Sequence, residues 1–379
     1  MENLVLYRKY RPRTFSEVVN QAHVIKTLTN AILLGKVAHA YLFCGPRGTG
    51  KTTVARILAK AINCENRGKN YEPCNKCASC AEINEGKSMD LIEIDAASNR
   101  GIDEIRELRE GIRFSPARLK YKVFIIDEVH MLTREAFNAL LKTLEEPPAH
   151  AIFILATTEI HKMPQTIISR CQRFDFHKFV LSDIVERLKF IAGQEKVKID
   201  KPALELIALN ADGAIRDAES LLGQVMAMED KEITLEEVQT ILGTVDISSV
   251  VQMVDFILKK DAGGGIGFIN KIVEEGYDLG QFAKSLINYL RKMMILKTVP
   301  STALGASSEI ERFRSLIAPE FTDEQLKTIL EQGQKLSSAD IIKLLHLFIE
   351  AENQIKSAIF PQLPLELVMV ELIDTKKTQ

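Results

Sequence analysis

The sequence predicts an α/β domain with a parallel sheet, followed by two all-helical regions, and three observations support this prediction. Short apolar segments alternate with amphipathic helices over about the first 178 residues, which is the pattern of a parallel sheet covered by helices. A glycine-rich loop directly follows the first apolar segment and opens a helix. Beyond Phe179, only helical periodicity continues.

Five segments of the first region are expected to be strands. Three of them, the second to the fourth, carry near-continuous apolar runs rather than strict alternation, as strands buried on both faces do. In order along the chain, the five segments are Ala40–Cys44, Leu91–Asp95, Lys122–Asp127, Ala151–Thr157 and Arg173–Phe176.

At 379 residues the chain is too long for one compact core, so two or three domains are expected. From Ser182 to about Leu242 the sequence predicts small helices separated by turns. Gly263–Gly265 predicts a break inside a third region, in which Ile341 and Leu344 follow helical spacing. The expected domains are 1–178, 179–242 and 243–373, with a polar tail at 374–379, beyond which we expect the natural chain to be able to continue.

The composition disfavours some classes of protein. No apolar run approaches the ~20 residues that cross a bilayer, and the N-terminus has no signal-peptide pattern, so a cytoplasmic protein is expected.

The formal net charge is −2, but residues 1–60 hold ten Lys and Arg against two acidic residues, so this segment carries +8 and the rest carries −10. A basic first domain suits a polyanionic ligand. The alternative is that these charges simply solvate helix surfaces.

The glycine-rich loop fits the pattern G-x-x-x-x-G-K-[ST] in full. It follows the expected strand Ala40–Cys44 and opens the helical run Val54–Ile62, which is the context that a phosphate-binding loop requires. Backbone N–H groups of such a loop surround phosphates, and the helix N-terminus adds favourable dipole charge. We therefore expect Lys51 to reach the β- and γ-phosphates of ATP and the Thr52 hydroxyl to ligate Mg²⁺. The expected ATP-binding residues are those of the loop and the residue directly after it: Gly45, Pro46, Arg47, Gly48, Thr49, Gly50, Lys51, Thr52 and Thr53.

Hydrolysis also needs acidic groups, and two acidic residues end the third expected strand. Asp127 should hold the Mg²⁺ shell, because the carboxyl end of a parallel strand faces the ligand-binding crevice. Glu128 can orient and polarise the attacking water. An acidic pair at a strand end is also common as a structural feature, but its coexistence with the phosphate loop favours the catalytic interpretation.

Three further residues are candidates for catalysis. The fourth expected strand ends beside Thr158, whose hydroxyl would lie near the acidic pair if the two strands are neighbours. Arg170 and Arg216 lie outside the phosphate loop. An arginine on a helix is most often solvated or salt-bridged, but phosphoryl transfer needs a rigid guanidinium to stabilise charge on the γ-phosphate.

These motifs resemble AAA+ clamp loaders, specifically the gamma/tau family of bacterial DNA polymerase III, over essentially the whole chain. The segment Tyr7–Phe15, which includes Arg11, is similar to the family's adenine-cradling opening. Ser169–Cys171 matches the family's SRC motif. Asn20 stands where the family's V-x-G-Q motif has glycine.

The resemblance implies roles for the three candidates outside the loop and the acidic pair. Thr158 aligns with the family's sensor 1. Arg216 matches sensor 2, an arginine of the lid that touches the γ-phosphate in its own subunit. Arg170 matches a finger that acts on the ATP of a neighbouring subunit, so the active ATPase would be an oligomer.

The resemblance also implies a RecA-like P-loop domain with an inserted zinc module, a small helical lid and an all-α collar that oligomerises. ATP binding between subunits would order a spiral that opens a sliding clamp, and primer–template DNA would trigger the hydrolysis that releases the closed clamp. The implied partners are subunits of the delta and delta-prime types, copies of the chain, the clamp and DNA at the bacterial replication fork. Polymerase and helicase contacts would come through a C-terminal extension, and this chain would hold no polymerase site.

Four of the six cysteines cluster with the spacing C-x9-C-x2-C-x2-C, at Cys64, Cys74, Cys77 and Cys80. In a cytoplasmic chain such clustering favours a metal over disulfides, and four thiolates make a closed tetrahedral Zn²⁺ site with a structural role. An iron–sulfur cluster is an alternative, but the ferredoxin run needs a cysteine where this chain has Asn84. Similar modules in the gamma/tau family carry zinc. A metal-free thiol cluster is the third interpretation.

Contacts with DNA have the weakest support. The chain has no Trp and 6% aromatic residues, which argues against a stacking platform for single strands. The resemblance implies phosphate contacts at the starts of two expected helices, which carry Ser98, Asn99, Arg100 and Thr133. Both positions also fit ordinary N-caps, and this interpretation is favoured over contact with DNA.

Two rival functions remain open. Another AAA+ ATPase, such as a branch-migration helicase or an unfoldase, is disfavoured by the cysteine cluster and the SRC motif. His130 superficially completes a D-E-x-H helicase box. The resemblance implies instead that His130 is a neutral packed residue. A non-hydrolysing scaffold subunit of the delta-prime type shares the cysteines and the SRC motif but lacks a working P-loop. Intact Lys51, Thr52 and Glu128 speak against that rival.

Overall fold

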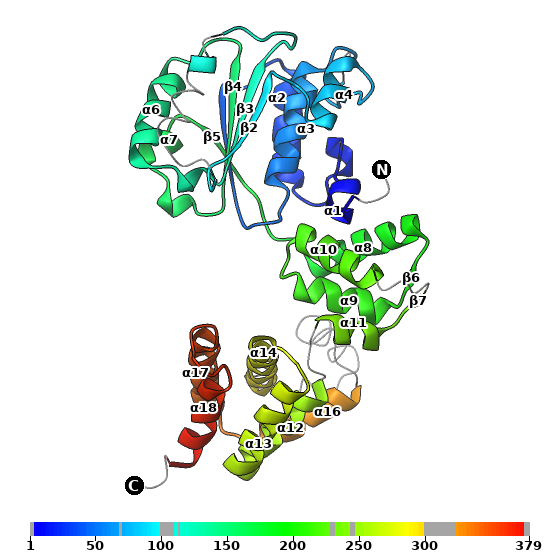
Figure 1. The fold of residues 1–379 in the computed structure, drawn as a ribbon, viewed down its shortest axis with the longest axis vertical. Helices are drawn as coiled ribbons and strands as arrows, with labels where there is room; N and C mark the ends of the chain where they lie inside the picture. The colour runs from blue at the N-terminus through cyan, green and yellow to red at the C-terminus, as the bar shows by residue number, and fades with distance from the viewer. Residues whose placement is uncertain are drawn as a thin grey trace. The chain divides into compact units, whose positions relative to one another are not determined.

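The structure is a computed structural model that describes residues 4–67, 70–98, 110–112, 114–227, 232–242, 247–298 and 323–374. Its elements are shown in Figure 1, and the chain divides into two compact units. The first unit holds Met1–Ile199 and Ile207–Lys231, and the second holds Asp200–Leu206 and Glu232–Gln379. The three-domain division predicted from the sequence stays a prediction. None of the helices in the described ranges is long and apolar enough to span a membrane.

The first unit is built on a five-stranded parallel sheet with the strand order β2-β3-β4-β1-β5 (Figure 1). Four strands have the predicted bounds, and β5 begins and ends one residue earlier than predicted. Because all strands run in the same direction, their carboxyl ends meet at one edge. There the residues after β4 lie between those after β1 and those after β3. The strands are β1 (Ala40–Cys44), β2 (Leu91–Asp95), β3 (Lys122–Asp127), β4 (Ala151–Thr157) and β5 (Gln172–Asp175).

The strands differ in burial according to their place in the sheet. All residues of β1 and β4 are buried, as are the four central residues of β3. The predicted burial on both faces is therefore confirmed for β3 and β4. It is wrong for β2, which has no buried residue, because β2 is an edge strand with a single neighbour.

Helices cover both faces of this sheet (Figure 1). Helices α2 and α3 pack on one face against strand residues such as Phe43. Helices α6 and α7 pack on the other face against residues such as Phe153, with alternate side chains of each strand serving the two cores. These helices are α2 (Ala22–Leu33), α3 (Lys51–Asn63), α6 (Arg134–Glu145) and α7 (Gln165–Ile168); the shorter elements are α1 (Leu6–Lys9), α4 (Ala78–Glu85) and the 3₁₀ turns η1 (Phe15–Glu17), η2 (Val129–Met131) and η3 (Ile160–Lys162).

Beyond the sheet the chain is mainly helical, as predicted, but not entirely. Two strands of two residues each occur among the helices, so the expectation of helices alone beyond Phe179 is wrong there. Strands this short leave no periodic pattern in a sequence. The elements are α8 (Leu181–Glu195), β6 (Lys198–Ile199), α9 (Lys201–Asn210), α10 (Ile215–Met226), β7 (Glu232–Ile233) and α11 (Leu235–Leu242).

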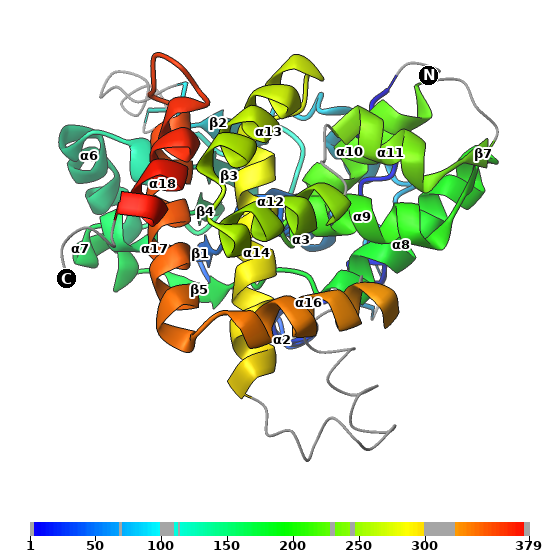
Figure 2. The same ribbon diagram turned by 90° about the horizontal axis from the view of Figure 1, so that it is seen from below.

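The second unit has a helical core. Helix α14 packs against α16 and α17, and α18 packs against α13 and α17 (Figure 2). Ile341 and Leu344 are buried in this core, as their helical spacing predicts. Helix α17 begins at a capping box, in which Ser337 and Asp340 bond each other's backbone N–H groups. The helices are α12 (Ile247–Lys259), α13 (Ala262–Glu274), α14 (Leu279–Thr298), α16 (Asp323–Lys335), α17 (Ser338–Ile355) and α18 (Leu363–Asp374).

The break predicted at Gly263–Gly265 lies instead just before these glycines. They belong to the first turn of α13, because the Asp261 side chain caps this helix by accepting the Gly264 N–H at 2.8 Å. The chain turns at Lys260, whose φ of 57° is left-handed. A side chain at Gly264 would meet Phe256 at 2.6 Å, so the small residue allows α12 and α13 to approach closely.

Candidate nucleotide site and cysteine cluster

The glycine-rich loop connects β1 to α3. Gly50 is the N-cap residue of α3 with a φ of 95°, and Gly48 has a φ of 76°, a region of backbone conformation that favours glycine. A Cβ atom at Gly48 would lie only 2.7 Å from the Cβ of Ala214. The loop is therefore a tight turn that ends at a helix N-terminus, which is the arrangement that binds phosphate groups.

The Lys51 ammonium group lies inside this loop. Its Nζ donates to the carbonyls of Gly45 at 2.7 Å and Pro46 at 2.8 Å, and the residue is 6% exposed. Burial lowers the pKa of Lys51, while Glu128 and Asp127 act in the opposite direction. An ammonium group hydrogen-bonded to neutral carbonyls can exchange them for an anionic acceptor, which forms stronger bonds.

A second polar contact joins the start of α3 to the end of β3. Thr52 Oγ1 donates to Asp127 Oδ2 at 2.7 Å, and Asp127 Oδ1 accepts the Glu128 N–H at 3.0 Å. Hydroxyl and carboxylate oxygens are the ligands that Mg²⁺ prefers. The pair of Thr52 and Asp127 therefore fits one such cation bound beside the loop.

Glu128 is bonded to the residue that follows β4. Its Oε2 accepts from Thr158 Oγ1 at 2.8 Å and from the Thr158 N–H at 3.3 Å. Glu128 has a φ of 48°, a left-handed conformation that is uncommon for this residue type and often found at functional sites. Strands β3 and β4 are neighbours, so the condition for placing Thr158 near the acidic pair is met.

His130 packs between two carboxylates. Its side chain is 5% exposed, its Nδ1 lies 3.4 Å from Glu128 Oε2, and its Nε2 lies 3.4 Å from Glu159 Oε1. Its Nδ1 also lies 3.0 Å from Thr157 Oγ1. His130 is therefore packed, as predicted, but it contacts the side chain of Glu128, the residue predicted to orient the attacking water. Nothing in the sequence pattern pointed to Glu159.

Arg216 lies at the start of α10, next to the glycine-rich loop. Ala214, which precedes this helix, is the residue that a side chain at Gly48 would meet. The Arg216 guanidinium lies 4.8 Å from the centroid of the Tyr7 ring, a distance at which a cation–π contact is favourable. A hydrogen bond to Arg216 lowers the pKa of Tyr7.

Arg170 is bonded elsewhere. Its Nη2 lies 2.6 Å from Glu145 Oε1 on α6, and its Nη1 donates to the Thr166 carbonyl on α7 at 2.7 Å. Within the described part of the chain, Arg170 makes no hydrogen bond to the glycine-rich loop or to the acidic pair. The structure therefore places the start of α10, which carries Arg216, next to the loop, and it leaves Arg170 on the side formed by α6 and α7.

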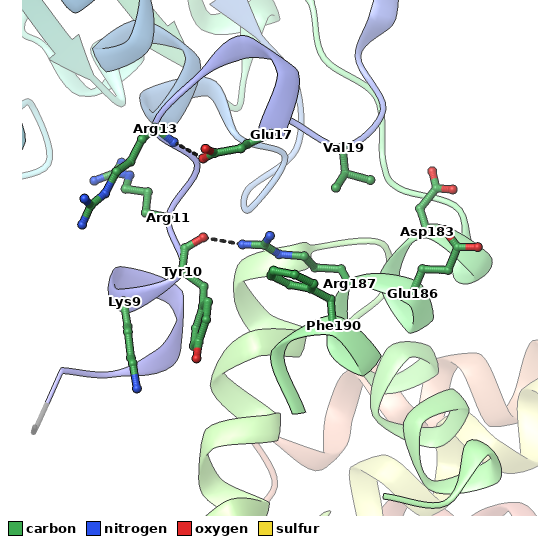
Figure 3. A pocket seen from close by; sticks show the side chains of 10 residues that line it. All are labelled: Lys9, Tyr10, Arg11, Arg13, Glu17, Val19, Asp183, Glu186, Arg187 and Phe190. Carbon is green, nitrogen blue, oxygen red and sulfur yellow. Dashed lines mark hydrogen bonds between the residues drawn. The ribbon is translucent and has the colours of Figure 1, made fainter. Parts of the chain in front are cut away.

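The N-terminal segment (residues 7–17) lines a cavity of about 520 Å³ together with α8 (Figure 3). Arg11 Nε donates to Thr53 Oγ1 at 3.1 Å, which ties this segment to the residue after the loop. Burial and the nearby Arg56 lower the pKa of Arg11 to about 10. The lining residues are Lys9, Tyr10, Arg11, Arg13, Glu17 and Val19 on one side and Asp183, Glu186, Arg187 and Phe190 on the other.

A buried ion pair fixes this segment against α8 and α10. Arg187 Nε lies 2.9 Å from Glu219 Oε1, and Arg187 also donates to the Tyr10 carbonyl (Figure 3). Burial raises the pKa of Glu219, although the adjacent guanidinium opposes this shift. Sequence reasoning missed this pair. The available hint was a glutamate next to Ala218 on the buried, apolar face of an amphipathic helix.

The four clustered cysteines lie in one group within the cysteine module (residues 64–85, described except for 68 and 69). Their Sγ atoms all lie within 4.8 Å of one another, and a tetrahedral Zn²⁺ site with Zn–S bonds of about 2.3 Å needs sulfur atoms about 3.8 Å apart. Although burial opposes ionisation, N–H groups of Lys76 and Cys77 lower the pKa of Cys74 to about 6. The donor set fits a closed, structural zinc site made by Cys64, Cys74, Cys77 and Cys80.

The candidate DNA contacts are only partly described. Asn99 and Arg100 lie outside the described residues. Ser98 Oγ donates to Asp95 Oδ2 at 3.2 Å. Thr133 caps α6 by accepting the Ala136 N–H at 3.3 Å, which confirms the N-cap interpretation for this residue. Contact with DNA stays a prediction for all four.

Family models cover nearly the whole chain. A model of the "DNA polymerase III, delta subunit" matches residues 20–180. A model of the "DNA polymerase III clamp loader subunit, ATPase lid domain" matches residues 183–231. A model of "DNA polymerase III subunits gamma and tau domain III" matches residues 233–379.

Individual relatives agree with these models. The chain is 42% identical to the DNA polymerase III subunit tau of Bacillus subtilis, over 99% of this chain and 64% of that one. It is 41% identical to the corresponding tau subunit of Escherichia coli, over 83% and 49%. It is also 41% identical to the DNA polymerase III subunit gamma of Buchnera aphidicola, over 79% and 82%. The chain thus spans 64% and 49% of the lengths of these two tau subunits.

Among solved structures, the chain is similar to a Holliday junction branch migration motor of Thermotoga maritima. The two are 20% identical with a TM-score of 0.46, over 66% of this chain and 79% of that one. A likeness of this size carries no argument about function.

Proposed function

The chain belongs to the gamma/tau family of DNA polymerase III clamp-loader subunits, and from this premise we propose that it is an ATP-driven motor subunit of a bacterial clamp loader. In this proposal, ATP binding opens a ring-shaped sliding clamp, and hydrolysis closes it on primer–template DNA during replication. One observation carries the proposal: a phosphate-type loop, the Thr52–Asp127 pair and the Glu128–Thr158 pair meet at one edge of the sheet.

The residues around the loop have separate roles in this proposal. Backbone N–H groups from Gly45 to Thr53 bind the phosphates, and Lys51 exchanges its loop carbonyls for β- and γ-phosphate oxygens. Thr52 and Asp127 hold Mg²⁺, which neutralises charge on the phosphates. Glu128 orients the attacking water, and Thr158 holds the Glu128 carboxylate in place. Arg11, in the segment that lines the cavity, helps to bind the nucleoside.

The two arginines complete the site from different subunits. Arg216 acts on the γ-phosphate of its own chain, which its place beside the loop supports. Arg170 acts on the ATP of a neighbour, which its bonds on the side of α6 and α7 support. A site that needs a neighbour's guanidinium implies assembly with other loader subunits.

The proposed partners are those of a clamp loader. They are subunits of the delta and delta-prime types, copies of this chain, the sliding clamp and primer–template DNA, the last contacted near Ser98, Asn99, Arg100 and Thr133. Since the matched tau subunits are longer, polymerase and helicase contacts are proposed for a C-terminal extension. The site of action is the replication fork in the bacterial cytoplasm.

Three domains are proposed for these tasks. A P-loop domain (1–178) carries the zinc module, a lid (179–242) carries Arg216, and a collar (243–373) holds the assembly together, with a tail at 374–379. The bounds of the matching family models, 20–180, 183–231 and 233–379, support this division. Zinc stabilises the fold in this proposal and takes no part in hydrolysis.

Steady-state ATP turnover by the reconstituted loader tests the proposal. Turnover should rise when clamp and primed DNA are both present, and the loader should place clamps on DNA. The matched control is Glu128→Gln, which replaces the carboxylate with an amide of nearly the same shape and should bind ATP without hydrolysing it. No turnover by the wild-type chain in the complete assembly would favour the non-hydrolysing scaffold instead.

A further inference from the structure

Lys60 lies near the end of α3 that is away from the phosphate loop, and it joins this helix to two other segments. Its Nζ donates to the Arg13 carbonyl at 2.8 Å, to Asn75 Oδ1 at 2.7 Å and to Asn84 Oδ1 at 2.8 Å. The first acceptor belongs to the N-terminal segment and the other two belong to the cysteine module. Lys60 is 2% exposed, so its three donors depend on these bonds rather than on water.

Glu72 forms a second connection between the same two segments. Its Oε2 accepts the Phe15 N–H at 2.8 Å, and its Oε1 accepts the Ser16 N–H at 2.9 Å. Bonds from one carboxylate to two consecutive backbone N–H groups are strong and set the position of the backbone. Asn75 Nδ2 adds a bond to the Arg13 carbonyl at 3.3 Å. The cysteine module therefore holds residues 13–16 at several points.

The other end of the N-terminal segment contacts the nucleotide site. Arg11 bonds Thr53, directly after the glycine-rich loop, and the Tyr7 ring lies under Arg216. Only Pro12 separates Arg11 from Arg13. Because proline restricts both its own backbone and that of the residue before it, this short connection is stiff. A displacement at Arg13 would therefore displace Arg11.

We propose that the cysteine module positions the nucleotide site, and that Lys60 and Glu72 couple metal binding in the module to nucleotide binding at the loop. Both are positioning residues, because their bonds run to the N-terminal segment and not to the loop. The inference rests on the ATP binding of the proposed function. Since coupling between two sites is reciprocal, metal must tighten nucleotide binding by the same factor by which nucleotide tightens metal binding.

Two affinities of the purified full chain test this coupling. The first is the affinity for a fluorescent ATP analogue, measured with Zn²⁺ bound and after chelation. The second is the affinity for Zn²⁺, measured by chelator competition with and without the analogue. We expect both to change by the same factor, at least about fivefold. Equal nucleotide affinity in the loaded and the folded, metal-free chain would overturn the proposal.

A variant that keeps the metal separates positioning from unfolding. Glu72→Gln retains all four cysteines but replaces one acceptor oxygen with an amide donor, so the metal-loaded variant should bind the analogue at least about threefold more weakly. Glu82→Gln is the matched control, because Glu82 lies in α4 and pairs with Arg118 rather than with the N-terminal segment.

Wild-type affinity in metal-loaded Glu72→Gln would overturn the proposal even if the metal-free chain unfolds. A metal-loaded wild-type chain that binds no nucleotide at all would contradict the proposed function itself, and this inference with it. The two failures are therefore distinguishable.

Discussion

The two ends of α3 each hold a buried lysine, and the two lysines have different kinds of partners. Lys51 donates to two carbonyls of the loop in which it lies. Lys60 donates to three oxygens from other segments of the fold. Burial lowers the pKa of both, to about 8 for Lys60.

The comparison teaches that the hydrogen-bond acceptors of a buried lysine, and not its burial, distinguish a lysine that binds a ligand from one that holds the fold together. Phosphate oxygens can replace the loop carbonyls around Lys51, since an anionic acceptor binds an ammonium group more strongly than a neutral one. The acceptors around Lys60 are held in place by their own segments, and two of them are side-chain amides. Changes at the loop end should therefore act directly on ATP use. Changes at the cysteine end should act on stability and, through the N-terminal segment, on nucleotide affinity.

The largest expected effect concerns ATP hydrolysis at the loop end of α3. It is expected for Arg170, which makes no hydrogen bond to the loop of its own chain within the described structure. Arg170→Ala should leave ATP affinity nearly intact but lower turnover of the assembled loader by about 10³–10⁵-fold, as the loss of an arginine finger does. Turnover and equilibrium ATP binding of the same reconstituted variant check this prediction.

Arg173→Ala is the matched control for this experiment. Arg173 is a nearby exposed arginine that pairs with Asp175, and its loss should leave turnover near the wild-type value. If assembled Arg170→Ala loader hydrolysed ATP as fast as wild type, Arg170 would have no role in a neighbour's site.

The next effect concerns the cysteine end. Lys60→Met should lower the free energy of unfolding by about 2 kcal/mol, because it removes a charged donor from three part-buried hydrogen bonds. Lys26→Met, on the exposed face of α2, should change it by less than about 0.5 kcal/mol. Denaturant unfolding of both metal-loaded variants measures the difference, and equal losses would contradict the structural role of Lys60.

The stability difference at Lys60 should also depend on pH. With a pKa of about 8 in the folded chain and 10.5 as the ordinary value, Lys60 binds fewer protons folded than unfolded between these two pH values. The wild-type chain should therefore gain stability relative to Lys60→Met as the pH rises from about 8 to 10.5. A difference that stays constant or shrinks over this range would show that Lys60 is not buried as a charged group.

The smallest effect lies outside α3 and tests the N-cap role of Thr133, for which a DNA contact is also proposed. Thr133→Ala should lower the free energy of unfolding by about 1 kcal/mol, because the Ala136 N–H loses its acceptor. Thr133→Ser keeps the hydroxyl and should retain most of this stability. Thermal unfolding of both variants checks the prediction. An unchanged free energy of unfolding in Thr133→Ala would show that the Thr133 cap does not stabilise α6.

Patterns carried by neighbouring residues could be predicted from the sequence. Four strands have the predicted bounds, and the glycine-rich loop lies between β1 and α3, because apolar runs and turn residues act locally. The cysteine spacing likewise indicated the cluster that the structure brings together. The placement of Thr158 beside Glu128 was expected only on the condition that β3 and β4 are neighbours.

Contacts between residues far apart in the sequence could not be predicted. The bonds of Lys60, the Arg187–Glu219 pair and the Glu145 partner of Arg170 each join segments whose adjacency depends on the fold. The apolar residues of β2 look buried in the sequence, but the strand order places them at an edge. Local composition does not encode strand order, since that order depends on how the connecting helices pack.

Equilibrium binding of ATP to the purified chain, compared with Lys51→Ala, tests the central claim most directly. The account predicts saturable binding by the wild-type chain and at least about tenfold weaker binding by the variant, because charge-assisted bonds to phosphate are lost. Zinc content and fold should be equal in the two proteins, since Lys51 bonds only to the loop within the described structure. Equal ATP affinities, or no ATP binding by the wild-type chain, would contradict the account.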